Sequence, residues 1–140
     1  MSYYIKTATH ASAYSKFRPT PPQMLVEKII EFIKEKISEP LATSIDIGCG
    51  SGQSTKILSP YFQKVIGIDN NDSQIELAQS QNITKNISYR LGSAENFLVE
   101  DASVQLVTAC QCAHWFDIYK FYEEVSRVLQ PEGVLALYVL

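Results

Sequence analysis

No stretch of this sequence is apolar for long enough to cross a membrane, since a helical span needs about 18 such residues. The first ten residues are polar and lack the apolar core of a secretory signal. Basic residues are also scarce, because 12 lysines and arginines stand against 15 aspartates and glutamates, and the formal net charge is −3. Without a basic stripe, we expect neither a nucleic acid nor a membrane surface as partner.

Cysteines are few and odd in number. Cys49, Cys110 and Cys112 lie in apolar surroundings, which predicts reduced thiols and a cytoplasmic location rather than a disulfide framework. Cys110, Cys112 and His114 would share one face of a straight strand, but a fourth ligand is missing, so we expect no metal site. Internal repeats and low-complexity tracts are absent as well, and 140 residues suit one domain.

The sequence does contain short apolar runs that alternate with helical periodicities. A helix is predicted from the proline-rich segment 19–22 to about Ile37. Strands are predicted at 44–47, 64–68, 87–91, 104–110 and 134–140, and further helices at 53–58, 73–81 and 116–129, with a capping box opening at Ser73. This alternation predicts an α/β fold, a Rossmann-like three-layer sandwich with a mostly parallel sheet of about five strands. For a fold of this class we expect the strand order 3-2-1-4-5.

A glycine-rich turn follows the first predicted strand. Segment 46–52 reads Asp-Ile-Gly-Cys-Gly-Ser-Gly and leads into a helix. Glycines let a ligand approach the main chain, and ligands of open α/β sheets bind at the carboxyl ends of the strands. Asp69 closes the second strand, 23 positions after Asp46, close to the roughly 20 expected between such a turn and a ribose-binding acid. The pattern predicts a pocket for a nucleoside cofactor.

The details of the turn narrow the choice of cofactor. A dinucleotide fingerprint requires glycine where Gln53 stands, which disfavours an NAD-type dehydrogenase, and no Gly-Lys-Ser/Thr follows as a P-loop would require. Asp46, two residues before the first glycine, would repel a pyrophosphate. It suits the amino group of a methionine moiety, or the ordering of the loop that holds one.

Three segments together resemble the class I S-adenosylmethionine-dependent methyltransferases: the turn at 46–52, Val-Ile-Gly-Ile-Asp at 65–69 and Leu-Gly-Ser-Ala-Glu at 91–95. Segments 14–19 and 107–117 resemble the small-molecule branch that includes trans-aconitate methyltransferase-like proteins. The resemblance implies a lid at residues 1–20, a cofactor-binding domain at 21–140, S-adenosylmethionine as cofactor and a small-molecule acceptor, for which a carboxylic acid is one candidate class.

The resemblance also implies roles for individual residues. Gly48 and Gly50 admit the cofactor to the main chain, Asp69 holds the ribose, and Asn70 packs near the adenine. Ala94 and Glu95 contact the adenine edge, the Cys110 carbonyl faces the methionine amino group, and Tyr14 and Arg18 close over the methionine end. His114 is the candidate catalytic base, needed only if the acceptor must lose a proton.

This chain departs from the family pattern at three places. Gln105 stands where relatives carry aspartate, and Glu132 replaces a glycine of a Pro-Gly-Gly turn. Relatives also continue with two further strands, whereas this chain ends at Leu140. If strand 134–140 is an apolar sheet edge, we expect a second copy or another partner to cover it, or a longer protein. The alternative function is a truncated cofactor-binding or interaction module without turnover.

Overall fold

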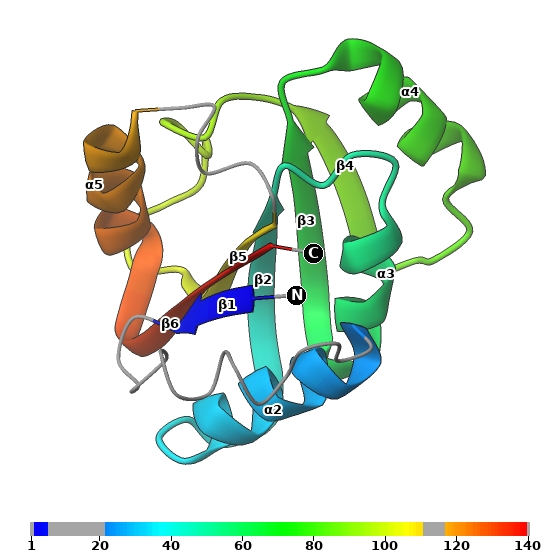
Figure 1. The fold of residues 1–140 in the computed structure, drawn as a ribbon. Helices are drawn as coiled ribbons and strands as arrows, with labels where there is room; N and C mark the ends of the chain where they lie inside the picture. The colour runs from blue at the N-terminus through cyan, green and yellow to red at the C-terminus, as the bar shows by residue number, and fades with distance from the viewer. Residues whose placement is uncertain (1, 6–21, 111–116, 140) are drawn as a thin grey trace.

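The computed structural model describes residues 2–5, 22–110 and 117–139. One six-stranded sheet has the order β1-β6-β5-β2-β3-β4, with helices on both faces (Figure 1). The strands are β1 Ser2–Ile5, β2 Leu41–Ile47, β3 Phe62–Asp69, β4 Ile87–Leu91, β5 Val104–Cys110 and β6 Leu129–Val139. The helices are α2 Pro22–Lys34, α3 Gln53–Leu58, a 3₁₀ turn Ser59–Tyr61, α4 Asp72–Gln81 and α5 Ile118–Val128.

The five parallel strands confirm the predicted fold. β2 pairs in parallel with β3 and β5, β3 with β4, and β5 with β6. Numbered along the chain, these strands follow the predicted order 3-2-1-4-5. β1 adds a sixth strand, antiparallel to β6, that the sequence did not predict.

Two apolar clusters, one on each face of the sheet, make the three layers. Alternate residues of a strand point to opposite faces. Val65 and Leu106 accordingly pack in the cluster that includes α2, α3 and α4, while Ile66 and Val107 pack in the cluster that includes α5. Burial of these aliphatic side chains is the main source of stability, since each fully buried one contributes about 1.5–3 kcal/mol.

Helix α4 begins differently from the prediction. The sequence suggested a capping box opening at Ser73, but the cap is Asn71, whose side-chain oxygen accepts the backbone N–H of Gln74 at 3.1 Å. An asparagine that follows a strand end in an extended conformation can reach the first free amides before a serine inside the helix does. The capping-box prediction was therefore wrong by two positions.

Part of the last parallel strand, residues 136–139, is paired on its outer side, so the premise of an open edge does not hold there. The expected second copy, other partner or longer protein stays a prediction. Residues of β1 pair with β6 from Ser2↔Val139 to Ile5↔Ala136. Figure 1 shows this short strand alongside β6, with the two chain ends close together. The backbone groups of β6 along this stretch thus find partners within the chain.

The turn predicted at 130–133 lies inside β6 and carries a strained residue. Glu132 has φ +67°, in the left-handed region that favours glycine, and its side chain is exposed. We expect Glu132→Gly to raise the free energy of unfolding by about 0.5–1 kcal/mol, because relief of strain exceeds the added freedom of the unfolded chain. Urea denaturation measures the change. Glu132→Ala keeps a Cβ and serves as control; an equal gain there would contradict the explanation.

At the opposite side of the sheet, side-chain amides cover part of the edge strand β4. The Gln79 Nε2 group donates to the Tyr89 carbonyl at 3.0 Å, and the Asn82 Nδ2 group donates to the Ile87 carbonyl at 2.9 Å. Both amides come from α4 and the residue that ends it. Two carbonyls that point away from β3 are therefore already occupied.

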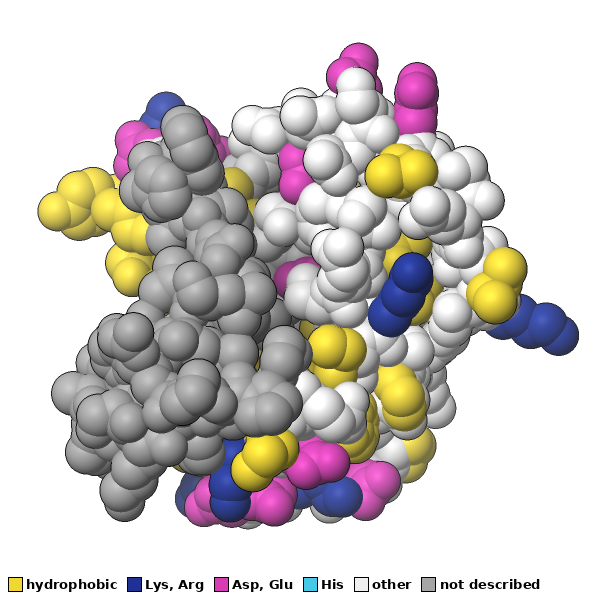
Figure 2. Space-filling view, turned by 45° about the vertical axis from the view of Figure 1, so that its right-hand side comes forward, with side chains coloured by type: hydrophobic (Ala, Val, Ile, Leu, Met, Phe, Trp, Pro, Cys, Tyr) yellow, Lys and Arg dark blue, Asp and Glu magenta, His cyan; other side chains and the backbone are white. Residues whose placement is uncertain are grey.

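Charged side chains of both signs are mixed on the surface of α2. Figure 2 shows basic and acidic side chains together at the lower end of the molecule, where this helix lies. Lys28 and Glu31 approach to 3.7 Å, and Lys34 and Glu39 to 2.8 Å. Within the described part of the chain, no helix is long and apolar enough to cross a membrane.

Candidate cofactor site

The three segments that carry the motifs meet at one edge of the sheet. β2, β3 and β4 are parallel neighbours, so their carboxyl ends lie side by side. The amides of Gly48 and Cys49 donate to the Ile68 carbonyl at 2.7 and 3.1 Å, and the Gly92 amide donates to the Asp69 carbonyl at 2.9 Å. The end of β3 therefore holds the glycine turn on one side and the segment after β4 on the other.

Asp69 faces the glycine turn, as the sequence predicted. Its Oδ2 accepts the Gly50 N–H at 2.9 Å, and its Oδ1 accepts the Asn71 N–H at 2.9 Å. A carboxylate has about four acceptor positions, so two remain after these bonds. The half-buried side chain is thus fixed in orientation and keeps the capacity to accept two hydroxyl groups.

The three glycines of the turn serve different purposes. Gly48, Gly50 and Gly52 have φ values of 71°, 57° and 103°, all in the region that L side chains rarely adopt. Among the described atoms, the nearest to a Cβ built on Gly50 is Gln74 Oε1 at 3.9 Å, an ordinary van der Waals distance, so no described atom crowds Gly50. A Cβ on Gly52 would instead overlap the Tyr89 hydroxyl and lie 2.8 Å from its Cζ.

Tyr89 fills the space beneath the turn. Its ring would also meet a Cβ on Gly67 at 2.7 Å, so the residue is wedged between two glycines. The hydroxyl is buried and has no hydrogen bond of acceptable geometry with the described residues, although the Thr55 hydroxyl, which donates to Asp46, lies nearby. Burial raises the pKa of Tyr89 above its ordinary value of 10, and the phenol stays protonated. Gly52 therefore makes room for protein rather than for ligand.

Asp46 is fully buried under the turn and bonded to three hydroxyl groups. Its Oδ2 accepts the hydroxyls of Ser54 and Thr55, both at 2.7 Å, and its Oδ1 accepts the Thr108 hydroxyl at 2.8 Å. Burial raises the pKa of this carboxyl, while the three hydroxyl donors oppose the rise. These contacts favour the second role considered for Asp46, the ordering of the loop that holds the ligand.

The segment after β4 approaches the site between two anchors. Its first residue, Gly92, is held by Asp69, and Glu95 lies 3.9 Å from Lys120 of α5. Ala94 is half-buried against the apolar cluster of the α5 face. Asn70, at the other side of Asp69, is exposed. Ala94, Glu95 and Asn70 therefore all lie next to the end of β3 or β4.

Other predicted site residues are only partly covered by the structure. Cys110 is the last residue of β5 and pairs with Tyr138 of β6, at the same carboxyl edge of the sheet. Tyr14, Arg18 and His114 lie outside the described residues, as does most of the predicted lid. Among the residues that are described, no group of three or more His, Cys, Asp or Glu side chains could hold a metal ion.

Gln105, one of the departures from the family pattern, has a structural role. It is buried, and its Oε1 accepts the Ala42 N–H at 2.6 Å across β5 and β2. Residues that the sequence interpretation missed include Ser54, Thr55 and Thr108, which bind Asp46. The sequence signal for Ser54 and Thr55 was a pair of hydroxyl residues in the first turn of α3. The signal for Thr108 was a threonine inside an apolar strand, and its contact with Asp46 can be inferred only once β2 and β5 are known to be neighbours.

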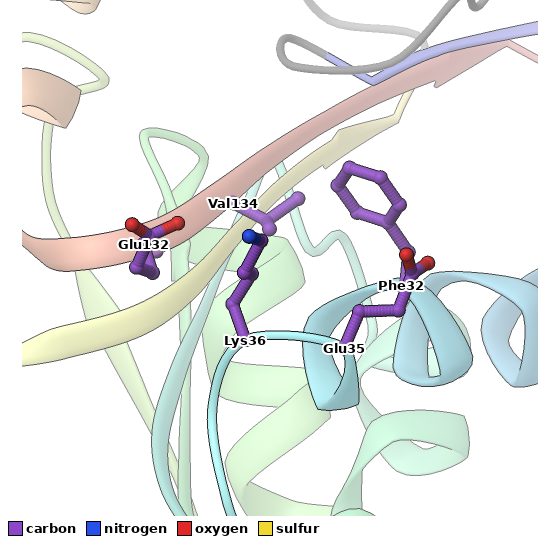
Figure 3. A pocket seen from close by; sticks show the side chains of 6 residues that line it. Phe32, Glu35, Lys36, Glu132 and Val134 are labelled. Carbon is purple, nitrogen blue, oxygen red and sulfur yellow. The ribbon is translucent and has the colours of Figure 1, made fainter.

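A pocket of about 220 Å³ lies away from these motifs, between α2 and β6. Figure 3 shows Phe32 and Val134 at its apolar side, with Glu35, Lys36 and Glu132 around it. Val134 pairs with Leu106 in the first half of β5, so this pocket lies toward the amino ends of the parallel strands. It is separate from the site at their carboxyl ends.

Residues 45–137 match the family model described as "Methyltransferase domain", a match that contains the glycine turn, Asp69 and the segment after β4. The chain belongs to this methyltransferase family. A Dictyostelium discoideum protein named as a methyltransferase is 39% identical over 133 residues, which cover 95% of this chain and 48% of that protein. A Saccharomyces cerevisiae protein named as a probable S-adenosylmethionine-dependent methyltransferase is 28% identical over 140 residues, covering 96% and 47%.

A solved structure with a similar fold is also related to this chain in sequence. The YcgJ protein of Bacillus subtilis has a TM-score of 0.71 and 30% identity, over 80% of this chain and 48% of its own. Class I methyltransferases of this kind normally bind S-adenosylmethionine as methyl donor. The methyltransferase chain spans about half the length of the curated relatives it matches.

Proposed function

We propose that this chain is the cofactor-binding part of an S-adenosylmethionine-dependent methyltransferase that acts on a small molecule. The observation that carries the proposal is the pairing of Asp69 with the turn: its carboxylate is bonded to the Gly50 amide at 2.9 Å, and no described atom crowds the main chain at Gly50. Two unused acceptor positions on Asp69 suit the vicinal hydroxyls of a ribose. The family membership and the relatives named as methyltransferases support the same conclusion.

S-adenosylmethionine would supply an activated methyl group on a sulfonium, and the protein would supply position and alignment. Asp69 would bind the ribose, Gly48 and Gly50 would line the methionine side, and Ala94 and Glu95 would border the adenine. His114 remains our candidate for a base if the acceptor must lose a proton. A carboxylate acceptor needs no base, and a small carboxylic acid is therefore a suitable first class to test.

Calorimetry with S-adenosylhomocysteine and with NAD tests the cofactor. We expect the first to bind, and Asp69→Ala to weaken it roughly ten- to hundredfold, because hydrogen bonds to a charged group contribute about 1.5–3 kcal/mol. Asp72→Ala, an exposed acid at the start of α4, should leave the affinity unchanged. Thermal unfolding of both variants checks their folding. Preference for NAD, or equal affinities in the two variants, would overturn the proposal.

Turnover is a separate question, answered by methyl release from labelled S-adenosylmethionine with a panel of small acids. Methylation of one member would support the small-molecule assignment. Tight binding without transfer to any acceptor would instead support the alternative of a binding module without turnover.

A further inference from the structure

Helix α5 carries three charged side chains along one stripe. Lys120, Glu124 and Arg127 are spaced by four and three residues, so they lie above one another on the same side of the helix. The stripe is directed at the irregular segment that joins β4 to β5. This segment contains Ala94 and Glu95 and continues to Asp101.

Each member of the stripe contacts a different residue of the segment. The Lys120 ammonium lies 3.9 Å from Glu95, and the Glu124 carboxylate accepts the Phe97 N–H at 2.7 Å. The Arg127 guanidinium donates to the Val99 carbonyl at 2.8 Å and to the Asp101 carboxylate at 2.7 Å. Residues 97, 99 and 101 are therefore hydrogen-bonded to α5, and Glu95 lies within ion-pair distance of it. Irregular backbone needs such partners, because it has none from a sheet or helix of its own.

Glu124 is the centre of this arrangement. It is 8% exposed, and both of its oxygens accept from Arg127, at 2.8 Å from Nε and 2.7 Å from Nη2. Hydrogen bonds from Arg127 lower the pKa of Glu124 despite its burial, so the pair stays ionised. A buried carboxylate adds little net stability compared with apolar packing, yet it fixes geometry. The anchoring of Phe97 also includes its ring, which lies 6.1 Å from that of Phe121.

The segment is thus fixed at two ends. Gly92 is bonded to the Asp69 carbonyl, next to the proposed ribose site, and Phe97 is bonded to Glu124. Ala94 and Glu95 lie between these two points. Their position relative to the turn therefore depends on α5 as well as on β4.

We propose that the stripe of Lys120, Glu124 and Arg127 sets the position of Ala94 and Glu95 so that the site distinguishes adenine from other purines. The inference rests on the proposed function, in which these two residues border the adenine. Glu124 acts here as a positioning residue, because it contacts the segment and Arg127. If the segment loosened, Asp69 and the glycine turn would stay in place, but Ala94 and Glu95 would no longer be held in one position against the purine edge.

The test compares Glu124→Gln with Glu123→Gln, an exposed neighbour on the same helix. Glutamine can still accept the Phe97 N–H but removes the ion pair between position 124 and Arg127, whose remaining charged partner is Asp101. Affinities are measured for S-adenosylhomocysteine and for S-inosylhomocysteine, in which oxygen replaces the purine amino group. We expect Glu124→Gln to weaken S-adenosylhomocysteine about tenfold and to reduce the preference over the inosine analogue. Glu123→Gln should change neither. An unchanged affinity, or a loss with the preference retained, would overturn the inference.

Hydrogen exchange gives a readout that needs no ligand. The Phe97 amide and its neighbours should exchange faster in Glu124→Gln, while amides of β3 and β5 keep their rates. Unchanged exchange in the segment would overturn the positioning role whatever the binding result. If the unmodified protein binds no S-adenosylhomocysteine, the proposed function and the adenine preference both fail, and the exchange rates decide alone whether α5 holds the segment.

Discussion

Asp46→Ala is expected to lower the free energy of unfolding by about 2–5 kcal/mol, because it removes the acceptor of three hydroxyl groups. Thr55 and Thr108 are fully buried and cannot turn to water instead. For a chain of this size, the melting temperature should fall by roughly 10–20 °C. Denaturant and thermal unfolding measure the loss. A variant as stable as the unmodified protein would contradict the role given to this network.

Asp46→Asn is the matched variant, since it keeps the shape and one oxygen acceptor. We expect Asp46→Asn to lower the free energy of unfolding by less than half as much as Asp46→Ala, because burial disfavours a charge and asparagine carries none. Since the folded-state pKa is raised from 3.8, the contribution of Asp46 is fully present below that pH and is lost as pH rises through the folded value. The stability difference between the unmodified protein and Asp46→Asn should therefore narrow from about pH 4 upward. If the stability difference widened with rising pH instead, the hydroxyl donors would have a larger effect on the pKa of Asp46 than burial has.

Gly52→Ala is expected to lower the free energy of unfolding by about 3 kcal/mol. The φ of 103° strains any L residue by about 1–2 kcal/mol, and the new methyl group would overlap Tyr89, which adds an overpacking cost of about 1–3 kcal/mol. Tyr89→Phe removes only a buried hydroxyl that has no hydrogen bond with the described residues, so alone it should change stability by less than about 1 kcal/mol. In the phenylalanine background, Gly52→Ala should cost less, and a double-mutant cycle measures this coupling.

Gly50→Ala separates the ligand-facing glycine from the structural one. Its φ of 57° implies a strain of about 1–2 kcal/mol, without a clash among the described atoms. The variant should remain folded, yet bind S-adenosylhomocysteine at least tenfold more weakly, because the methyl group enters the space over the turn. If Gly50→Ala binds normally while Gly52→Ala does not, the assignment of the two glycines is reversed.

Much of the fold could be predicted because its signals are local. Apolar runs predicted the five parallel strands, and the fold class suggested their order. The spacing of Asp69 from the turn predicted that its carboxylate lies near the turn, and it is bonded to Gly50. The Asp69–Gly50 contact itself joins residues 19 positions apart, and it forms because β2 and β3 are parallel neighbours. The description of Gly52 was less complete, because its partner Tyr89 lies 37 positions away on β4.

The remaining features depend on contacts between distant segments. The pairing of Ser2–Ile5 with β6 joins opposite ends of the chain, and no pattern in four residues announces it. Glu124 and Arg127 read as ordinary surface charges of an amphipathic helix until the segment at 95–101 lies against them. The same holds for Thr108, whose hydroxyl meets Asp46 only when β5 and β2 are adjacent.

The amides of Gln79 and Asn82 have a consequence for how molecules meet in concentrated solution. An edge strand with unpaired N–H and C=O groups can pair with a strand of another molecule, which is a common first step toward aggregation. Here two of the carbonyl acceptors that a strand of another molecule would use are already bonded to the side chains of Gln79 and Asn82. The arrangement discourages growth of the sheet on that side, in addition to the charge that Arg90 places in β4.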